Sequence, residues 1–232
     1  MSQKSNKKKV AIMFTDIANF TQMMSVNEKS SLDFLDTKKD KLRKLVKIYK
    51  GKYVKDIGDG TLTYFPTPSN ALDCALKLHY ALSDFDKLEI RVGIHYGEMI
   101  SVKGDIYGDS VNIASRLEHL SPAGGICISG ELFNILPNKN QVKTDYIGLQ
   151  SFKGVGRLID VYAVNDSKLK KANIEDYVTE NIEIKYEKVP TVTLFPFNNK
   201  GEKEDEFFAY CMSTDIASEL GSNGKIKVTT FE

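Results

Sequence analysis

The sequence Ile57-Gly58-Asp59-Gly60 separates two short segments with strand character, Lys52–Lys55 and Thr61–Phe65. This spacing predicts a β-hairpin with a carboxylate at its tip. Glycines beside that carboxylate allow the backbone to approach a ligand closely. An acid in such a turn is by itself usually a solvated turn residue. The hairpin requires a sheet around it, and it places one acidic side chain at the end of two strands.

A second acid, Asp16, ends the apolar strand that begins at Val10. A helix is expected just after it, and for Asp16 alone an N-cap role would be the better interpretation. Paired with Asp59, it favours a metal site, because convergent carboxylates are costly unless a cation joins them. Two carboxylates at neighbouring strand ends are the protein part of a Mg²⁺ site that also needs substrate phosphates.

The order of the remaining elements predicts an α+β fold. A long helix is expected to end near Gly51, a second to follow Pro68, and a third to cover Asp109–His119. Strands are expected at Glu89–His95, Met99–Val102, Gly125–Ser129, Gln141–Phe152 and Arg157–Val164. This β-α-β-β-α-β order, with additional C-terminal strands, is that of the ferredoxin-like split βαβ arrangement. We expect one sheet with helices on one face.

The domain boundaries follow from changes in composition. We predict a basic N-terminal tail at residues 1–8, a folded domain at 9–166 and a charged linker at 167–189. Residues 190–232 predict a strand, a helix at Phe207–Leu220 and a second strand. A βαβ unit of about forty residues is too small to bury its own faces. We interpret it as the start of a second, truncated domain.

Composition narrows the range of partners. The net charge of +1 gives no support for a nucleic-acid or membrane-surface partner, and no apolar stretch approaches membrane-spanning length. The three cysteines are scattered and have no metal-site spacing. This pattern suits a reducing compartment and predicts a cytoplasmic protein.

Other polar residues indicate a function only when they are considered together. Asn112 and Arg116 are four residues apart on a predicted helix and share a face that suits a sugar and a phosphate. From spacing alone, a surface pair without a role is equally consistent. Asp105 precedes that helix, and Lys153 precedes a glycine-rich turn. Each of these two, taken singly, is typical of an ordinary turn residue.

Five separate segments together resemble the class III nucleotidyl cyclase catalytic domain over roughly residues 8–165. They are Phe14–Thr21, Val54–Gly60, Arg91–Gly97, Asp105–Arg116 and Lys153–Gly156. Their order and spacing also agree with that family. One departure is Asn19, where many family members have glycine.

The resemblance implies a role for each candidate residue. Asp16 and Asp59 would bind two divalent ions, Mg²⁺ or Mn²⁺, with the Ile17 carbonyl as a further ligand. The remaining positions are Phe20 and Thr21 for substrate binding, Asn112 for the ribose, Arg116 for the transition state and Lys153 for the terminal phosphates. All of the expected residue types are present, which favours an active enzyme over a degenerate, regulatory domain.

Lys55 and Asp105 match the base-selecting pair of the family. Adenine offers an acceptor at N1 and a donor at N6, which complement a lysine donor and an aspartate acceptor. Guanine reverses both, and each buried mismatch costs about 1–3 kcal/mol. The sequence therefore predicts an adenylate cyclase that converts ATP to 3′,5′-cyclic AMP and pyrophosphate. The alternatives are an inactive cyclase-like nucleotide sensor and a guanylate cyclase; a diguanylate cyclase lacks its Gly-Gly-Asp/Glu-Glu-Phe motif.

The hairpin also bears on assembly. Lys55 and Asp59 lie on one tight hairpin, whereas the base and the metal-bound triphosphate lie at opposite ends of ATP. Two copies related by a two-fold axis resolve this conflict, and the family resemblance agrees. We predict a head-to-tail homodimer with two shared active sites. The segment from Thr191 resembles the start of the amino-terminal domain of the TolB family, through Leu194–Phe197 and Asp215-Ile216.

Overall fold

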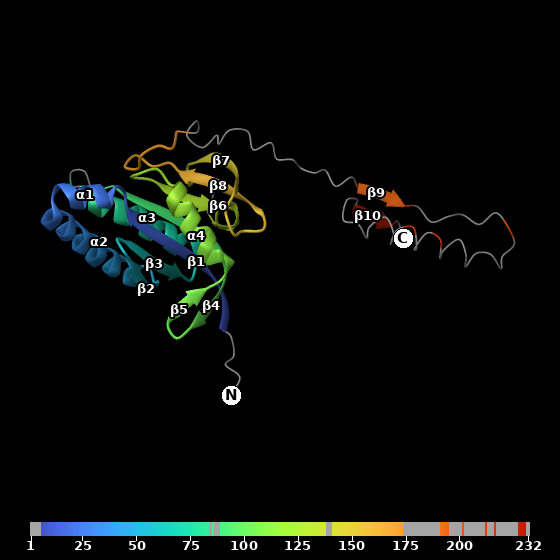
Figure 1. Ribbon diagram of the computed structural model, residues 1–232, viewed down its shortest axis with the longest axis horizontal. Coiled ribbons are helices and arrows are strands. Elements are labelled where there is room, and N and C mark those ends of the chain that lie inside the picture. Colours follow the sequence, from blue (N-terminus) through green and yellow to red (C-terminus); the bar gives the residue numbers. More distant parts are fainter. Residues whose placement is uncertain are drawn as a thin grey trace. The chain divides into compact units, whose positions relative to one another are not determined.

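The computed structural model describes residues 6–83, 85, 89–137, 141–173, 191–194, 201, 212, 216 and 227–230. The chain divides into two compact units, residues 1–177 and 178–232. The described residues of the first unit form an eight-stranded sheet and five helices (Figure 1).

The sheet of the first unit has the strand order β2-β3-β1-β4-β6-β8-β7, with β5 paired to β4. Its strands are β1 (Asn6–Ile17), β2 (Lys52–Ile57), β3 (Gly60–Phe65), β4 (Ile90–Val102), β5 (Asp105–Tyr107), β6 (Ile126–Ser129), β7 (Thr144–Ser151) and β8 (Leu158–Val164). β1 lies between β3 and β4 and is antiparallel to both. This is the split βαβ order, so the predicted ferredoxin-like core with additional C-terminal strands is confirmed.

The helices begin where side chains or proline favour a start. They are α1 (Phe20–Val26), α2 (Glu28–Ile48), α3 (Pro68–Leu82), α4 (Asp109–Leu120) and α5 (Gly130–Phe133). Asn27 caps α2 by accepting a hydrogen bond from the Ser30 N–H at 3.1 Å. Thr67 caps α3 in the same way, with Pro68 at its first position. Within the described residues, no helix combines the length and apolar character needed to cross a membrane.

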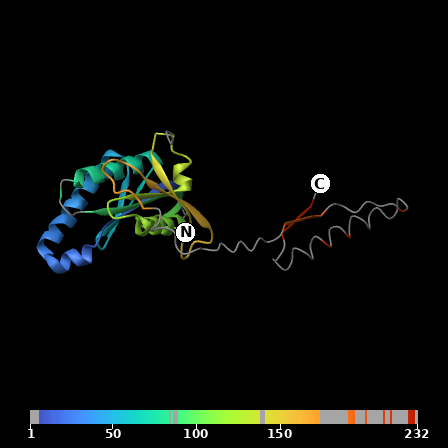
Figure 2. The ribbon, with the colours of Figure 1, turned by 90° about the horizontal axis from the view of Figure 1, so that it is seen from above.

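The helices cover both faces of the sheet, so the expectation of a single covered face is wrong. Ala11 and Met13 of β1 lie in the core that includes α2 and α3, whereas Val10 and Ile12 pack with Ala114 of α4. Figure 2 shows the α2–α3 pair and the green α4 on different sides of the sheet. Helical spacing identifies an apolar face but does not say which side of a sheet it covers.

The long strand β4 replaces two predicted strands. It runs unbroken beside β1, from the pair Asn6↔Ser101 to the pair Ile17↔Ile90. The basic run at residues 7–9 is thus part of β1, so the predicted tail ends before residue 6. Gly97 falls between the two predicted strands and makes room for α4, since a Cβ there would lie 2.3 Å from Ser110 Oγ.

Gly93 of β4 lies close against the backbone of α4, and its replacement is expected to destabilise the fold. A Cβ at this position would lie 2.0 Å from the backbone nitrogen of Glu118 and 2.5 Å from the Ala114 carbonyl oxygen. We expect Gly93→Ala to lower the free energy of unfolding by about 3 kcal/mol, because the helix must move away from the sheet. Gly156→Ala is the matched control, as its Cβ would meet nothing within 4 Å. Urea unfolding of both variants checks this, and equal midpoints would contradict it.

The second unit contains a parallel pair of strands, β9 (Thr191–Leu194) and β10 (Lys227–Thr230). These confirm the two predicted strands of the C-terminal βαβ unit. The predicted helix between them falls almost entirely outside the described residues, as do residues 174–189 of the predicted linker. The linker begins later than residue 167, because Leu169 and Ala172 are buried in the first unit. The likeness to the TolB family stays a prediction.

Candidate active site

The two predicted metal-binding acids lie together. Asp16 is near the end of β1 and Asp59 is in the β2–β3 turn, where its Oδ2 accepts a hydrogen bond from the Ile17 N–H at 3.3 Å. Burial, and then a hydrogen bond with Asp59, raise the pKa of the Asp16 carboxyl to about 6. Two carboxyl groups that raise each other's pKa by close approach suit a divalent cation between them. The described residues hold no group of three or more His, Cys, Asp or Glu side chains that could bind a metal ion.

The raised pKa makes the stability of the metal-free protein depend on pH. The ordinary aspartate pKa is 3.8 and that of Asp16 in the fold is about 6. Between these values the folded protein binds more protons than the unfolded chain and loses stability as pH rises. Asp16→Asn cannot titrate, so in EDTA its stability relative to wild type should increase from about pH 4 to about pH 6. Urea unfolding of both proteins across this range measures the difference; a difference that stays constant would contradict the assignment.

The glycines beside Asp59 allow the turn to close on β1. Gly58 has a φ of 62°, which side chains rarely adopt. A Cβ on Gly60 would lie 3.3 Å from the Thr15 carbonyl oxygen and 3.6 Å from Asp16 Oδ1. The glycines predicted to allow close approach to a ligand therefore also bring the two acids together.

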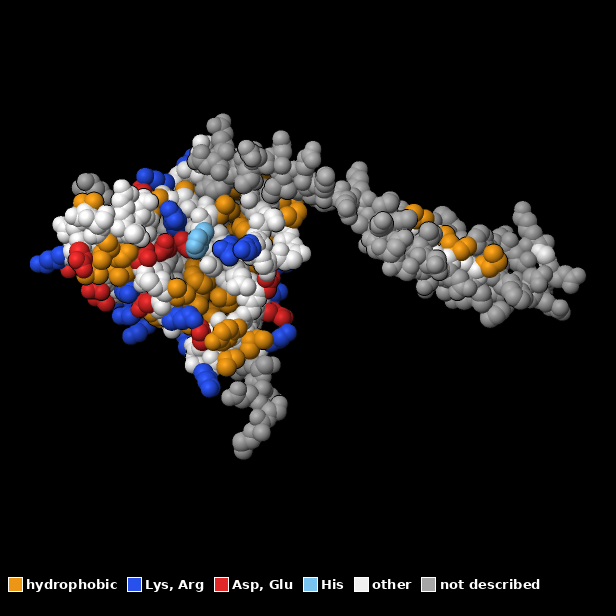
Figure 3. Space-filling view, in the orientation of Figure 1, with side chains coloured by type: hydrophobic (Ala, Val, Ile, Leu, Met, Phe, Trp, Pro, Cys, Tyr) orange, Lys and Arg blue, Asp and Glu red, His pale blue; other side chains and the backbone are white. Residues whose placement is uncertain are grey.

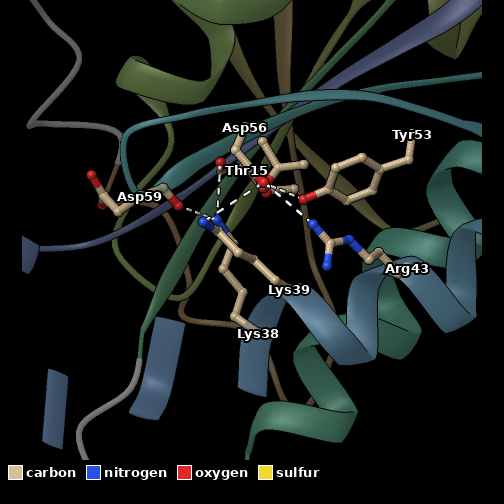
Figure 4. Close-up of polar contacts among 8 residues, drawn as sticks. Thr15, Lys38, Lys39, Arg43, Tyr53, Asp56 and Asp59 are labelled. Atoms are coloured by element: carbon tan, nitrogen blue, oxygen red, sulfur yellow. Dashed lines mark hydrogen bonds and ion pairs between the residues drawn. The ribbon is translucent and has the colours of Figure 1, made fainter. Parts of the chain in front are cut away.

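A residue that the sequence analysis missed lies behind this pair. Lys38 of α2 is fully buried, and its Nζ donates hydrogen bonds to the carbonyl oxygens of Asp59 at 2.6 Å and Thr15 at 3.3 Å. Figure 4 shows Lys38 reaching from α2 to both segments. Burial lowers the pKa of the Lys38 ammonium to about 8, and the nearby Asp16 and Asp59 partly offset this. A sequence signal was present: Lys38 is four residues from both Phe34 and Leu42, and so shares their buried face.

A second anchor fixes the hairpin to α2. Asp56 of β2 pairs with Lys39 at 3.7 Å and Arg43 at 3.4 Å, and it accepts a hydrogen bond from the Tyr53 hydroxyl (Figure 4). These exposed pairs each contribute little stability. They connect α2 to β2, the strand that carries Lys55.

Asn19 follows the strand that carries Asp16. This residue has a φ of 59° and a ψ of 27°, the left-handed conformation that glycine adopts freely and asparagine tolerates. Asn19 therefore adopts a backbone conformation that the glycine of many family members would also allow. Phe20 and Thr21 follow as the first residues of α1, the former half-buried and the latter exposed.

The predicted base-selecting pair forms within one chain. Lys55 Nζ of β2 lies 2.5 Å from Asp105 Oδ2 of β5, and the other Asp105 oxygen accepts from the Ile106 N–H at 2.8 Å. The hydrogen bond from Lys55 is the main cause of a lowered pKa for Asp105. Both side chains are partly exposed, so a ligand can reach them.

Asn112 and Arg116 lie on the exposed surface of α4. The same helix buries Glu118 towards the sheet. Burial is the main cause that raises the pKa of this carboxyl to about 7, and the negative charge of Asp16 contributes to the rise. Glu118 thus lies close enough to Asp16 for their charges to interact. Among the described residues, no hydrogen bond or ion pair joins Asn112 or Arg116 to Asp16 or Asp59. Lys153 is exposed in the turn between β7 and β8.

The face that carries α4 is partly apolar. Ile57, Val102 and Tyr107 are exposed at the β2, β4 and β5 end of the sheet. Phe14, Val54, Tyr64 and Val111 are only partly covered beside them. Figure 3 shows hydrophobic side chains gathered on this side of the domain. An apolar surface next to the site residues is typical of an interaction site.

Residues 2–166 match the family described as the adenylate and guanylate cyclase catalytic domain, and the chain belongs to this family. It is similar to putative adenylate cyclase 3 of Rhizobium meliloti, with 27% identity over 232 residues that cover 95% of this chain and 39% of the relative. It also resembles an adenylate cyclase of Glutamicibacter nicotianae, with 30% identity over 55% of this chain and 32% of the relative. The chain spans about two fifths or less of the length of these curated relatives.

Solved structures agree with the fold. The adenylyl cyclase CyaB from P. aeruginosa matches with a TM-score of 0.64 and 26% identity, over 71% of this chain and 97% of that chain. An adenylate/guanylate cyclase/hydrolase from Silicibacter pomeroyi matches with a TM-score of 0.65 and 30% identity, over 70% of this chain and 99% of that chain. These matches confirm the predicted class III cyclase fold for the first unit.

Proposed function

We propose that the chain is an adenylate cyclase, which converts ATP to 3′,5′-cyclic AMP and pyrophosphate at sites shared by two copies of the chain. The observation that carries this proposal is the convergence of Asp16 and Asp59 at neighbouring strand ends, with a raised Asp16 pKa. That arrangement is costly for the protein alone and is suited to a bound cation. The relatives named as adenylate cyclases support the same reaction.

The donor set fits Mg²⁺ or Mn²⁺, because hard divalent cations prefer oxygen ligands and are completed by substrate phosphates. Asp16, Asp59 and the carbonyl of Ile17 would hold two ions. When bound, these ions lower the pKa of the ribose 3′ hydroxyl and neutralise charge on the phosphates. The chain contributes two carboxylates already fixed beside each other by the β2–β3 turn.

The remaining residues would position and stabilise the nucleotide. The 3′ oxygen attacks the α-phosphorus, and pyrophosphate leaves. Asn112 would orient the ribose, and Arg116 would meet the charge that develops on the α-phosphoryl oxygens. Lys153, with Phe20 and Thr21, would hold the terminal phosphates. No protein nucleophile takes part in this reaction.

Base choice would depend on Lys55 and Asp105. Their ion pair presents a donor and an acceptor side by side at a partly exposed position. This is the complement of adenine N1 and N6, and it mismatches guanine at both atoms. The pairing therefore supports ATP over GTP as substrate.

The geometry of one chain favours a shared site. Arg116 and Asn112 point away from the sheet, whereas Glu118 of the same helix is close enough to Asp16 for their charges to interact. A second copy related by a two-fold axis would bring its α4 to the nucleotide held by Asp16 and Asp59. The apolar surface around Tyr107 and Ile57 would be buried in such a head-to-tail homodimer. We also propose a cytoplasmic location, which suits the free, buried Cys74 and Cys127.

Product identification tests the reaction. The protein is incubated separately with ATP and with GTP in the presence of Mn²⁺, and the products are separated by chromatography. We expect cyclic AMP and pyrophosphate from ATP, with little cyclic GMP from GTP. Bound but unchanged ATP would favour the nucleotide-sensor alternative, and cyclic GMP as the main product would favour a guanylate cyclase.

A further inference from the structure

The position of Lys38 is unusual for a lysine. Its side chain has no exposed surface and is among the largest fully buried side chains of the described residues. No carboxylate lies within ion-pair distance of it in that part of the chain. Instead, its Nζ donates to two backbone carbonyl oxygens that belong to different segments, Thr15 of β1 and Asp59 of the β2–β3 turn.

A role as core filler does not explain this arrangement. Burying an ammonium group is costly, and an apolar side chain of similar volume would occupy the same space without that cost. The ammonium instead joins two segments that are more than forty residues apart in sequence: Thr15 precedes Asp16, and Asp59 carries the other carboxylate. Because side chains alternate along β1, Asp16 lies on the face opposite α2. Lys38 thus approaches the Asp16–Asp59 pair from the sheet face opposite to the one on which Asp16 lies.

We propose that Lys38 is a positioning residue of the metal site: it ties the end of β1 to the β2–β3 turn and thereby holds the Asp16 and Asp59 carboxylates in register for divalent cations. This inference rests on the proposed function, because that function supplies the cations. Lys38 touches neither the nucleotide nor the reacting atoms. Its fixed positive charge also reduces the repulsion between the two acids when no cation is bound.

The contact has a defined mechanical consequence. The Thr15 and Asp59 carbonyls each belong to a residue at or next to a carboxylate ligand, so freeing either one lets a carboxylate move. Displacement of about 1 Å at a catalytic group can reduce a rate about a hundredfold. Residues that orient metal ligands from outside typically change metal affinity or activity by about 10–100-fold when replaced.

The test compares Lys38→Met with Lys38→Arg, and Lys44→Met on the exposed face of α2 is the matched control. Mn²⁺ binding is followed by electron paramagnetic resonance with 3′-deoxy-ATP, which cannot cyclise. We expect Lys38→Met to weaken Mn²⁺ binding by about 10–100-fold. Lys38→Arg should lose less, since it keeps the charge and the donors, and Lys44→Met should match wild type.

A second readout needs no metal. In EDTA, amide hydrogen exchange of peptides that cover residues 15–18 and 57–61 should accelerate at least about tenfold in Lys38→Met, with no change in β8. If Lys38→Met does not fold, Lys38→Gln replaces it, because it keeps an amide donor and removes the charge. Unchanged Mn²⁺ affinity together with unchanged exchange would overturn the inference. Absence of Mn²⁺ binding in wild type would instead overturn the proposed metal site, and the exchange result would then report on the tie between the two segments alone.

Discussion

Asp16→Ala and Arg116→Ala are each expected to remove nearly all cyclase activity, and a mixture of the two variants is expected to recover part of it. Asp16→Ala removes one of two carboxylates that converge on the proposed metal site. Loss of several kcal/mol of charge stabilisation corresponds to a decrease of about a thousandfold or more in rate. Arg116→Ala removes the cation proposed to meet the developing charge, at a cost of about 100–1,000-fold.

Recovery on mixing follows from the shared site. In a heterodimer, one of the two sites takes intact Asp16 and Asp59 from one chain and intact Asn112 and Arg116 from the other. The second site carries both defects. At equal concentrations about half of the dimers are heterodimers, each with one intact site, so about a quarter of the wild-type activity should return.

The experiment requires proof that subunits exchange. Two affinity tags, one on each variant, allow heterodimers to be purified before the assay. Glu28→Ala is a suitable control, because Glu28 is exposed at the start of α2 and is far in sequence from every proposed site residue. Persistent inactivity of verified heterodimers would show that each site is built from a single chain.

The second large effect is a change of substrate. Lys55→Glu combined with Asp105→Cys replaces the donor and the acceptor that lie 2.5 Å apart. The glutamate can accept from guanine N1, and the loss of Asp105 removes an acceptor that opposes guanine O6. Since each mismatched buried polar group costs about 1–3 kcal/mol, the ratio of kcat/KM for ATP over GTP should fall by about 100-fold or more.

The two single variants are controls for this change of substrate. Each single replacement should lower ATP turnover without a full gain of GTP turnover, because one mismatch with guanine persists. The ratio is measured by competition between the two nucleotides with Mn²⁺ present. An unchanged ratio in a folded double variant would show that Lys55 and Asp105 do not contact the base.

Local patterns in the sequence were enough to predict several parts of the site. Asp16 ends β1 and Asp59 lies in the β2–β3 turn, and β1 is the neighbour of β3 in the sheet, so this pair follows from the order of the elements. Lys55 and Asp105 lie on β2 and β5, which are not neighbours in the sheet, so their ion pair was expected only from the family resemblance. Which face α4 covers could not be predicted in this way, because it depends on the close approach of Gly93 to the Glu118 backbone.

Lys38 and Glu118 show a different limit. Both are ionisable residues at helical spacing from apolar neighbours, and both are buried. Charged residues are mostly exposed, so composition argues against burial at either position. Only the helical periodicity of α2 and α4 indicates that the two residues are buried. Which side chains are buried is settled once the position of each helix against the sheet is known.

The specific activity of the wild-type chain across a range of protein concentrations tests the central claim most directly. The assay measures cyclic AMP formed from ATP with Mn²⁺, alongside light scattering that reports the fraction of dimer. We predict that cyclic AMP is formed and that activity per milligram rises with concentration in parallel with dimer formation. Activity per milligram that is independent of concentration while the protein stays monomeric, or ATP binding without any cyclic AMP, would contradict the account.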